Sequence, residues 1–331
     1  MQQNSFSTNK GYNMTQKCKY SVIIPVYNGA RYLVDLHKEL NSFFEKFEEG
    51  KSIYEIVFVN DGSLDNSAQV IESLADQDSH ITAIYLSRNY GQHNATLCGL
   101  RQSKGEICIT MDCDLQHQPS EIPKLLTALN SGKRLVYGKY DHKRHGLLQN
   151  LGSWFMNKVL CDITGRQESI TSFRVFRREL VDLILEFDNP RVILDIMFSH
   201  VIAPKDVDHI VISHKNTVDG ESTYTFWKLC QFALDMLFNY SVVPLRIASI
   251  IGLVLSSFSF LLACLYAVLY LMGKIIVPGF TVTILAITFL SGIILFTQGI
   301  FGEYLGRIFL ISTRRPQYKI AKIKKSTLGK K

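Results

Sequence analysis

The 331-residue sequence lacks a C-x-x-C pair, and its cysteine number is odd. A zinc site and a disulfide framework are therefore not indicated, which fits a reducing cytoplasm. The first 19 residues also lack the apolar core of a signal peptide, so they are expected to form a disordered leader. The seven cysteines are Cys18, Cys98, Cys108, Cys113, Cys161, Cys230 and Cys264.

Charge is almost absent from residues 247–302. Residues 247–272 carry no charged side chain and exceed the ~20 residues that a helix needs to cross a bilayer. A second uncharged run follows at residues 275–302, of which 280–302 are expected to span. Two buried core helices are the alternative, but helices of this length in a soluble core usually show a polar stripe. Two transmembrane helices are therefore predicted.

The short turn at residues 273–279 makes these helices a hairpin, so the chain before it and the chain after it lie on one side. Arg246 precedes the first span, whereas the turn offers only Lys274. Residues 303–331 form a basic tail, and such an excess of positive charge predicts the cytoplasmic side of a bacterial inner membrane. The net charge of +7 is concentrated there, which favours anionic lipid headgroups over nucleic acid as its partner.

Residues 20–220 read as a soluble α/β domain. Short apolar runs at 20–26, 54–60, 81–86 and 107–111 predict buried strands. Between the first two runs, and again after the second, apolar residues recur at the spacing of one face of a helix. Strands that alternate with helices predict a mostly parallel, Rossmann-like sheet with helices on both faces.

Polar residues follow each predicted strand, at the edge where such sheets bind ligands. They are Tyr27-Asn28, Asp61-Gly62-Ser63, Ser87-Arg88-Asn89 and Asp112-Cys113-Asp114.

Within residues 221–246, the stretch 225–240 shows a narrow polar face, which predicts an amphipathic helix. Its place before a span favours the bilayer interface over packing on the soluble domain.

Asp112 and Asp114 are the sharpest chemical signal. Two carboxylates at a strand end can share Mg²⁺ or Mn²⁺, which prefer oxygen ligands, with substrate phosphates completing the site. A solvated acidic pair is the alternative. His117 is a possible ligand, although a surface histidine is favoured. Asp61, followed by Gly62-Ser63, places a carboxylate at the sheet edge; helix capping, which Ser63 or Asp65 could provide equally well, is the alternative.

Several motifs together carry a resemblance. Residues 21–28 (SVIIPVYN), 59–63 (VNDGS), 86–91 (LSRNYG) and 112–116 (DCDLQ) resemble the family 2 glycosyltransferases of GT-A fold. Residues 172–174 (SFR), 220–222 (GES) and 241–246 (SVVPLR), with the two spans, are similar to the polyprenyl-phosphate glycosyltransferases. That group includes relatives of dolichol-phosphate mannose synthase and the bactoprenol glucosyltransferases. The resemblance covers about residues 20–310.

The resemblance implies a role for each matching residue. Asp112, Asp114 and Arg174 would be catalytic, and the metal would be held by Asp112, Asp114 and Gln116. The acceptor phosphate would be bound by Arg174, Lys215 and Ser222. The nucleotide sugar would be bound by Pro25, Tyr27, Asn28, Asp61, Ser87, Arg88, Asp112 and Gln116.

The chain departs from the family pattern at three positions. Ser172 stands where an acid is common, Thr217 where an arginine is common, and Thr223 where a lysine is common. Lys215 or His214 can substitute for the missing arginine. These changes bear on the acceptor contacts and on the sugar.

The expected activity is inverting transfer of a sugar, from a nucleotide-diphosphate sugar such as a UDP-sugar, to undecaprenyl phosphate. Transfer to another glycolipid or polysaccharide is an alternative, although no QxxRW motif is present. A non-catalytic scaffold that binds a nucleotide is the other. Glycines in the second span favour a homo-oligomer. Neither the sugar nor the oligomer size can be read from the sequence.

Overall fold

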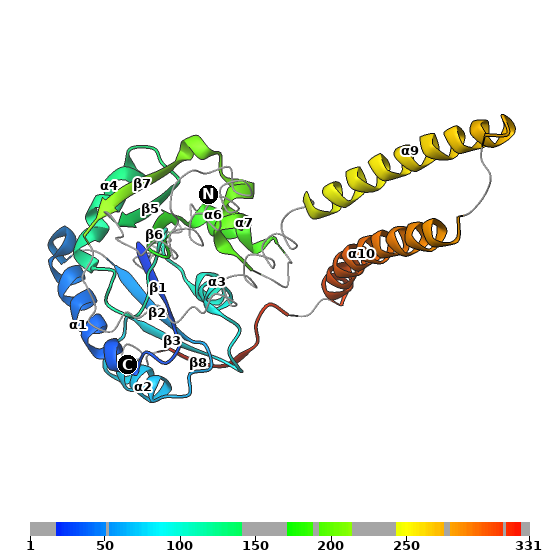
Figure 1. The fold of residues 1–331 in the computed structure, drawn as a ribbon. Coiled ribbons are helices and arrows are strands. Elements are labelled where there is room, and N and C mark those ends of the chain that lie inside the picture. Colours follow the sequence, from blue (N-terminus) through cyan, green and yellow to red (C-terminus); the bar gives the residue numbers. More distant parts are fainter. Residues whose placement is uncertain are drawn as a thin grey trace, which may run out of the picture. The chain divides into compact units, whose positions relative to one another are not determined.

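The computed structural model describes residues 18–50, 53–140, 171–187, 192–213, 243–274, 279–313 and 316–325 (Figure 1). They belong to two compact units. The first unit contains the described residues up to 213 together with residues 316–325, and the second contains those from 243 to 313. The predicted leader up to residue 17 and the amphipathic stretch 225–240 lie outside the described residues.

Within the described residues, the first unit is built on an eight-stranded sheet. The first three strands have the predicted bounds, and the fourth ends one residue earlier than predicted. The strands are β1 (Tyr20–Val26), β2 (Tyr54–Asn60), β3 (Ile81–Leu86), β4 (Ile107–Thr110), β5 (Leu135–Tyr140), β6 (Arg174–Arg177), β7 (Val207–Ile212) and β8 (Ile320–Lys325).

The sheet is mixed, with the spatial order β7-β5-β6-β4-β1-β2-β3-β8. Strands β4, β1, β2 and β3 run parallel to their neighbours in this group, and β5 is parallel to β7. β6 and β8 are antiparallel to the strands beside them. Both antiparallel strands lie beyond the four apolar runs from which strands were predicted, so the sequence pattern did not reveal them.

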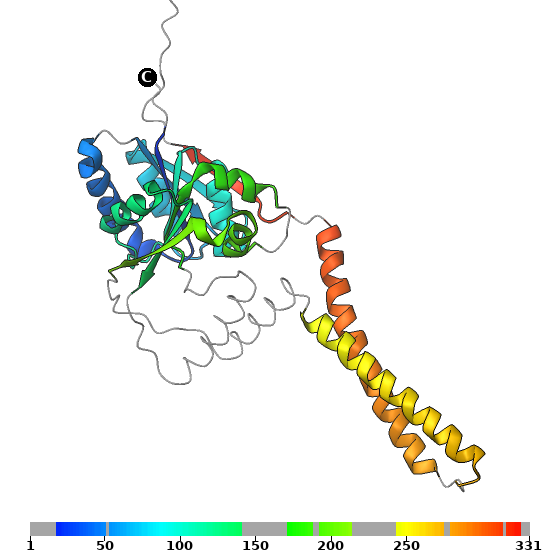
Figure 2. The same ribbon diagram turned by 90° about the horizontal axis from the view of Figure 1, so that it is seen from above.

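Helices cover both faces of the sheet, as predicted (Figure 2). Side chains alternate along each strand, so Ile24 faces one apolar core and Ile23 the other. The first core contains α1 (Ala30–Lys46), α2 (Ser67–Gln77) and α4 (Ile122–Asn130). The second contains α3 (Gln92–Gln102), α6 (Arg178–Leu185) and α7 (Leu194–Val201). Short 3₁₀ turns lie at Phe47–Gly50, Pro119–Glu121 and Pro204–Asp206.

The edge strand β8 comes from the end of the chain and pairs with β3. Lys322 Nζ lies 2.7 Å from Glu72 Oε1, and Lys324 Nζ lies 2.6 Å from Asp76 Oδ1, both acids being on α2. The predicted basic tail of residues 303–331 therefore contains ordered elements: α10 continues to Ser312, and residues 320–325 form the edge strand β8. These two lysines face acidic side chains of the protein.

The second unit contains two long helices that lie side by side, α9 (Val243–Leu271) and α10 (Phe280–Ser312) (Figure 2). α10 runs ten residues beyond the predicted span. Large apolar side chains are exposed along both helices, including Phe258, Leu261, Phe296 and Phe309. Among the described residues, one window, Phe289–Gly306 in α10, is long and apolar enough to cross a membrane.

Candidate active site

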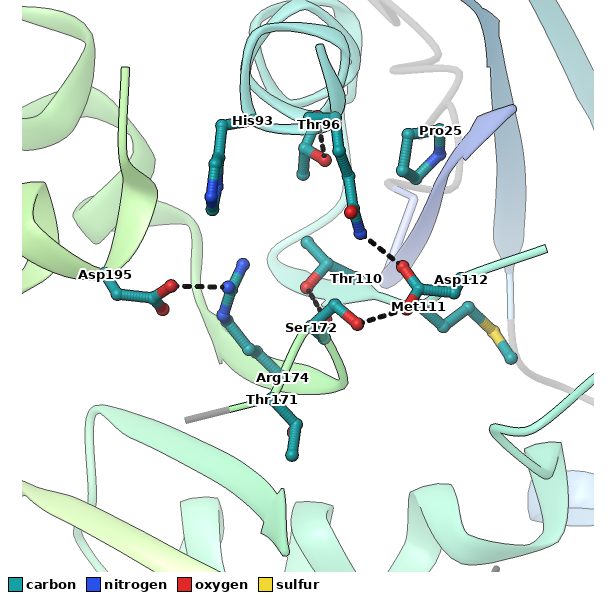
Figure 3. A pocket seen from close by; sticks show the side chains of 11 residues that line it. Pro25, His93, Thr96, Thr110, Met111, Asp112, Thr171, Ser172, Arg174 and Asp195 are labelled. Atoms are coloured by element: carbon teal, nitrogen blue, oxygen red, sulfur yellow. Dashed lines mark hydrogen bonds and ion pairs between the residues drawn. The ribbon is translucent and has the colours of Figure 1, made fainter. Parts of the chain in front are cut away.

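A cavity of about 260 Å³ opens at the carboxyl ends of β1 and β4 (Figure 3). The chain places β2 and β3 on one side of β1, then returns through α3 to β4 on the other side. Ligands of open α/β sheets bind in the crevice at this reversal of strand order. The cavity is lined by Pro25, Gln92, His93, Thr96, Thr110, Met111, Asp112, Thr171, Ser172, Arg174 and Asp195.

The loops after β1 and β2 are joined by reciprocal hydrogen bonds. The backbone amide of Asn28 donates to Ser63 Oγ (3.1 Å), and the backbone amide of Leu64 donates to the side-chain Oδ1 of Asn28 (2.8 Å). Asn28 has a positive φ of 53°, which asparagine tolerates better than most residues. Tyr27 beside it is 48% exposed. The rigid turn thus presents one of the predicted nucleotide contacts to solvent.

Asp61 is buried and holds the loop after β3. Its two carboxylate oxygens accept hydrogen bonds from the amides of Tyr90 (2.7 Å) and Gly91 (2.8 Å). Burial raises the pKa of Asp61, and these two hydrogen bonds oppose the shift. The helix-cap interpretation is wrong, because both oxygens bind this loop. Each oxygen keeps a second lone pair with which it can accept from a ligand.

Gly62 brings the loops after β2 and β3 into close contact. It has a φ of +65°, and a Cβ at this position would lie 2.6 Å from the carbonyl carbon of Arg88. Arg88 lies over the Tyr90 ring at 4.9 Å, and Ser87 Oγ is 3.0 Å from the Tyr90 hydroxyl. Ser87 and Arg88 are therefore held around one tyrosine at the end of β3. Only glycine satisfies both the backbone angle and the space.

Both carboxylate oxygens of Asp112 are bound by neutral donors. Ser172 Oγ donates to Oδ2 and Gln92 Nε2 to Oδ1, each at 2.5 Å. Burial raises the pKa of Asp112, and the hydrogen bond from Ser172 and the charge of Arg174 oppose the rise. Serine at the position where the family commonly has an acid thus orients this carboxylate.

His117 is buried, so the favoured prediction of a surface histidine is wrong. Its Nδ1 accepts a hydrogen bond from the Asp112 amide at 3.0 Å, and its ring stacks on Phe173 at 5.0 Å. That nitrogen is therefore occupied. The imidazole thereby holds the backbone of Asp112 in place.

Asp114 lies two residues along, in a turn with a strained backbone. Leu115 has a positive φ of 64°, which is unfavourable for a side chain of this shape. Asp114 Oδ1 accepts a hydrogen bond from the Gln116 amide at 3.1 Å. Burial raises the pKa of Asp114, and the nearby charge of Asp112 raises it further. A cation between the two carboxylates would relieve both effects.

The donor set at this site fits a divalent cation that the substrate helps to hold. Among the described residues, no group of three or more His, Cys, Asp or Glu side chains is arranged to bind a metal. Asp112 and Asp114 together provide two carboxylates. Mg²⁺ is commonly held by one or two carboxylates together with substrate phosphates. The site therefore suits Mg²⁺ or Mn²⁺ bound with a nucleotide diphosphate.

Arg174 lines the same cavity as Asp112 but is paired with another acid. Its Nη2 lies 2.9 Å from Oδ2 of Asp195, and both side chains are buried. The Tyr137 hydroxyl donates to the other oxygen of Asp195 at 3.1 Å. Among the described residues, Arg174 Nε has no hydrogen-bond partner. The predicted acceptor residues Lys215 and Ser222 lie outside the described part of the chain.

Several cavity residues were missed in the sequence, among them Asp195, Gln92 and His93. Asp195 is the only acid in the apolar run VILDIMF, and an isolated acid of this kind is a signal of a buried polar contact. Gln92 and His93 directly follow the LSRNYG string and begin the helix after β3. Burial lowers the pKa of His93 and favours the neutral imidazole.

Comparison with known proteins gives a consistent picture. Residues 21–185 match the model of a family described as glycosyl transferase family 2. The undecaprenyl-phosphate 4-deoxy-4-formamido-L-arabinose transferase of Proteus mirabilis is 34% identical over 92% of this chain and 94% of its own. The enzyme of the same name from Yersinia enterocolitica is 33% identical over 92% and 93%. At 92% of the chain, these matches extend well beyond the residues of the family model.

Among solved structures, glucosyl-3-phosphoglycerate synthase from Mycobacterium tuberculosis, in complex with Mn²⁺, UDP and glucosyl-3-phosphoglycerate, aligns with a TM-score of 0.48. The sequence identity is 14%, over 66% of this chain and 77% of that one.

Proposed function

Because the chain belongs to the family 2 glycosyltransferases, we propose that this glycosyltransferase moves a sugar from a UDP-sugar to undecaprenyl phosphate. The observation that carries the proposal is the similarity to two undecaprenyl-phosphate sugar transferases over more than nine-tenths of each chain. From these relatives we extend the acceptor, undecaprenyl phosphate, to this protein. The cavity beside Asp112 is consistent with it.

The donor nucleotide is proposed to bind across the ends of β1, β2 and β3. Tyr27 and Asn28 follow β1, Asp61 follows β2, and Arg88 follows β3. The diphosphate would then lie next to Asp112, which follows β4 beside β1. Asp112, Asp114 and Gln116 would hold the divalent cation, which neutralises charge on the nucleotide diphosphate as it leaves.

The transfer itself is proposed to be a single inverting displacement. A phosphate oxygen of the lipid attacks the anomeric carbon, and the bond from that carbon to the diphosphate oxygen breaks. The phosphate acceptor is already anionic near neutral pH, so no protein base is needed. The rate then depends on alignment of the reactants and on stabilisation of the departing charge.

Sheet connectivity supports two membrane crossings. β7 and β8 belong to one sheet, so they lie on the same side of any membrane. The chain between residues 213 and 319 must therefore cross an even number of times. If α10 crosses through its apolar window, α9 is the available second span, because no charged residue follows Arg246 within it. We propose a hairpin of α9 and α10.

The catalytic unit is proposed to face the cytoplasm of a bacterial inner membrane. Only Lys274 lies in the turn between the helices, whereas lysines and arginines are frequent beyond α10. Lys322 and Lys324 are paired within the protein, so this argument rests on the remaining basic residues. Glycines along α10 have open space around them, which is compatible with self-association.

The test is transfer of labelled sugar by purified full-length protein to undecaprenyl phosphate in mixed micelles. The donors are UDP-glucose, UDP-galactose, UDP-N-acetylglucosamine and the UDP derivative of 4-deoxy-4-formamido-L-arabinose. We expect one donor to label a lipid that mild acid hydrolyses, and labelling to require Mg²⁺ or Mn²⁺.

The same reaction without undecaprenyl phosphate, and with diacylglycerol in its place, is the control. Label that enters only diacylglycerol or a polymer would contradict the proposed acceptor. That result would support the alternative of a glycolipid or polysaccharide transferase.

A further inference from the structure

We propose that His93 contacts the transferred sugar and thereby helps to select it. This inference rests on the proposed function. The imidazole points from the first turn of α3 toward the guanidinium of Arg174, within the cavity beside Asp112 (Figure 3). None of the predicted site residues fills this position.

His93 differs from the other polar residues of the cavity in its hydrogen bonding. Among the described residues, no hydrogen bond involves either of its ring nitrogens. The other polar side chains of the lining each make at least one hydrogen bond: Thr96, Thr110 and Thr171 donate to backbone carbonyls, Gln92 and Ser172 to Asp112, and Arg174 Nη2 to Asp195, although Arg174 Nε has no partner among the described residues. The His93 side chain is half-buried and lines the cavity, so a ligand there can form a hydrogen bond with its ring without displacing another side chain of the described residues.

The position of the cavity favours the sugar over the nucleotide. Asp61 and Arg88 follow β2 and β3, on one side of β1, whereas the cavity lies over β1, β4 and β6 on the other. Asp112 lines the cavity and follows β4, the neighbour of β1, where the diphosphate is proposed to bind. A volume of about 260 Å³ is also below the ~300–1,000 Å³ of pockets for drug-sized ligands. It suits one sugar ring.

The charges favour a neutral ligand over the phosphate of the acceptor. Arg174 is the one cationic side chain in the lining set, and Asp195 compensates its charge at 2.9 Å. Asp112 adds a carboxylate. An anionic phosphate would therefore meet a guanidinium whose charge Asp195 already balances, although its Nε still has no partner among the described residues. A sugar hydroxyl or amide can both donate to and accept from a neutral imidazole.

The experiment compares binding of UDP with binding of each UDP-sugar of the panel, by titration calorimetry on the full-length protein with Mn²⁺ and without lipid. For His93→Ala we expect UDP affinity within twofold of wild type. Affinity for the preferred UDP-sugar should fall roughly 3- to 10-fold, as for one lost hydrogen bond. His93→Gln, which keeps a donor and an acceptor, should recover part of it.

His200→Ala is the matched control, because His200 lies on α7 outside the cavity and bonds the Ile196 carbonyl. Donor analogues that each lack one hydroxyl complete the test. The analogue without the contacted hydroxyl should bind wild type and His93→Ala equally.

Three results would overturn the inference. Equal weakening of UDP and UDP-sugar would place His93 against the nucleotide. A change confined to the KM for undecaprenyl phosphate would place it against the acceptor. Unaltered binding and kinetics would show no contact. Failure of wild type to glycosylate undecaprenyl phosphate would contradict the proposed function alone, since the binding comparison uses no lipid.

Discussion

Ser172 Oγ donates a hydrogen bond to Oδ2 of Asp112 across 2.5 Å and joins the start of β6 to the end of β4. The hydroxyl supplies a proton where a second carboxylate would supply only negative charge. Asp112 can therefore keep one orientation before any cation binds.

Ser172→Ala is expected to weaken Mn²⁺ binding in the presence of UDP roughly 3- to 10-fold, because one hydrogen bond to the carboxylate is lost. Electron paramagnetic resonance of free Mn²⁺ measures this. Ser199→Ala is the control, since that hydroxyl bonds the Ile196 carbonyl on α7. Unchanged Mn²⁺ affinity in Ser172→Ala would show that the hydroxyl does not position Asp112.

Asp114→Ala is expected to lower turnover by ~10²-fold or more, the scale of losing a preorganised charge stabiliser. Folding should be nearly unaffected, because the side chain lies in a turn at the sheet edge. Asp182→Ala removes an exposed acid of α6 whose ion pair is with Arg178 at 3.8 Å, and it should keep full activity. Wild-type turnover in Asp114→Ala would refute the metal assignment.

Gly62→Ala is expected to lower the free energy of unfolding by about 1–3 kcal/mol, through backbone strain and a clash with the Arg88 backbone. UDP affinity should fall with it. Gly132→Ala separates the two causes, since Gly132 also has a positive φ, of 104°, but nothing lies within 4 Å of its added Cβ. Urea denaturation of both variants measures the difference. Equal losses would mean that the clash is relieved at no cost.

Asp78 predicts a pH dependence of stability. Its Oδ2 lies 2.7 Å from His37 Nε2, and its Oδ1 lies 2.8 Å from His80 Nδ1. Burial alone would raise the pKa of Asp78, but hydrogen bonds from His37, His80 and Asn41 lower it well below its usual range. The hydrogen bond to Asp78 raises the pKa of His80.

The opposite pKa shifts of Asp78 and His80 predict that stability falls at both low and high pH. The Asp78 contribution is present above the unfolded pKa of ~3.9 and is lost as the pH falls further. The His80 contribution is complete below ~6.5 and is lost as the pH rises through the raised pKa. The contributions of Asp78 and His80 to the thermal midpoint should therefore both be present between about pH 4 and 6.5. In His80→Gln the loss on the alkaline side should diminish, and an unchanged slope there would contradict the assignment.

Truncation after Thr313 is expected to make the protein aggregate. It removes β8 and leaves the β3 edge open, and open edges pair with other chains. The loop after β3 would also lose the hydrogen bond from the Ser87 amide to the Lys319 carbonyl. Truncation after Lys325 keeps the strand and serves as the control. Size-exclusion chromatography in detergent compares them, and equal monodispersity would contradict this role of β8.

The four parallel strands and their polar ends could be predicted because short apolar runs and the residues that end them are local patterns. β6 could not be predicted in this way. Its four residues contain two arginines, and it is a strand because β4 and β5 pair with both of its edges. β8 carries three lysines, whose charge suggested a lipid-facing tail until Glu72 and Asp76 were placed beside it.

The candidate site divides in the same way. Asp112 and Asp114 were recognisable from their spacing, and Pro25, Asp112 and Arg174 do line one cavity. The pairing of Arg174 with Asp195 depends on β6 and α7 meeting in space, which no local pattern records. His93 could not be predicted as a site residue, because its position in the first turn of a helix does not show what its side chain contacts. Its place in the cavity lining becomes visible only in the folded structure.

The last strand of the sheet is translated after both long helices. Until residues 320–325 leave the ribosome, β3 has no neighbour on one side, so the globular unit stays incomplete while α9 and α10 are being made. A chain whose synthesis stops within α9 or α10 therefore lacks β8, and its β3 edge stays unpaired.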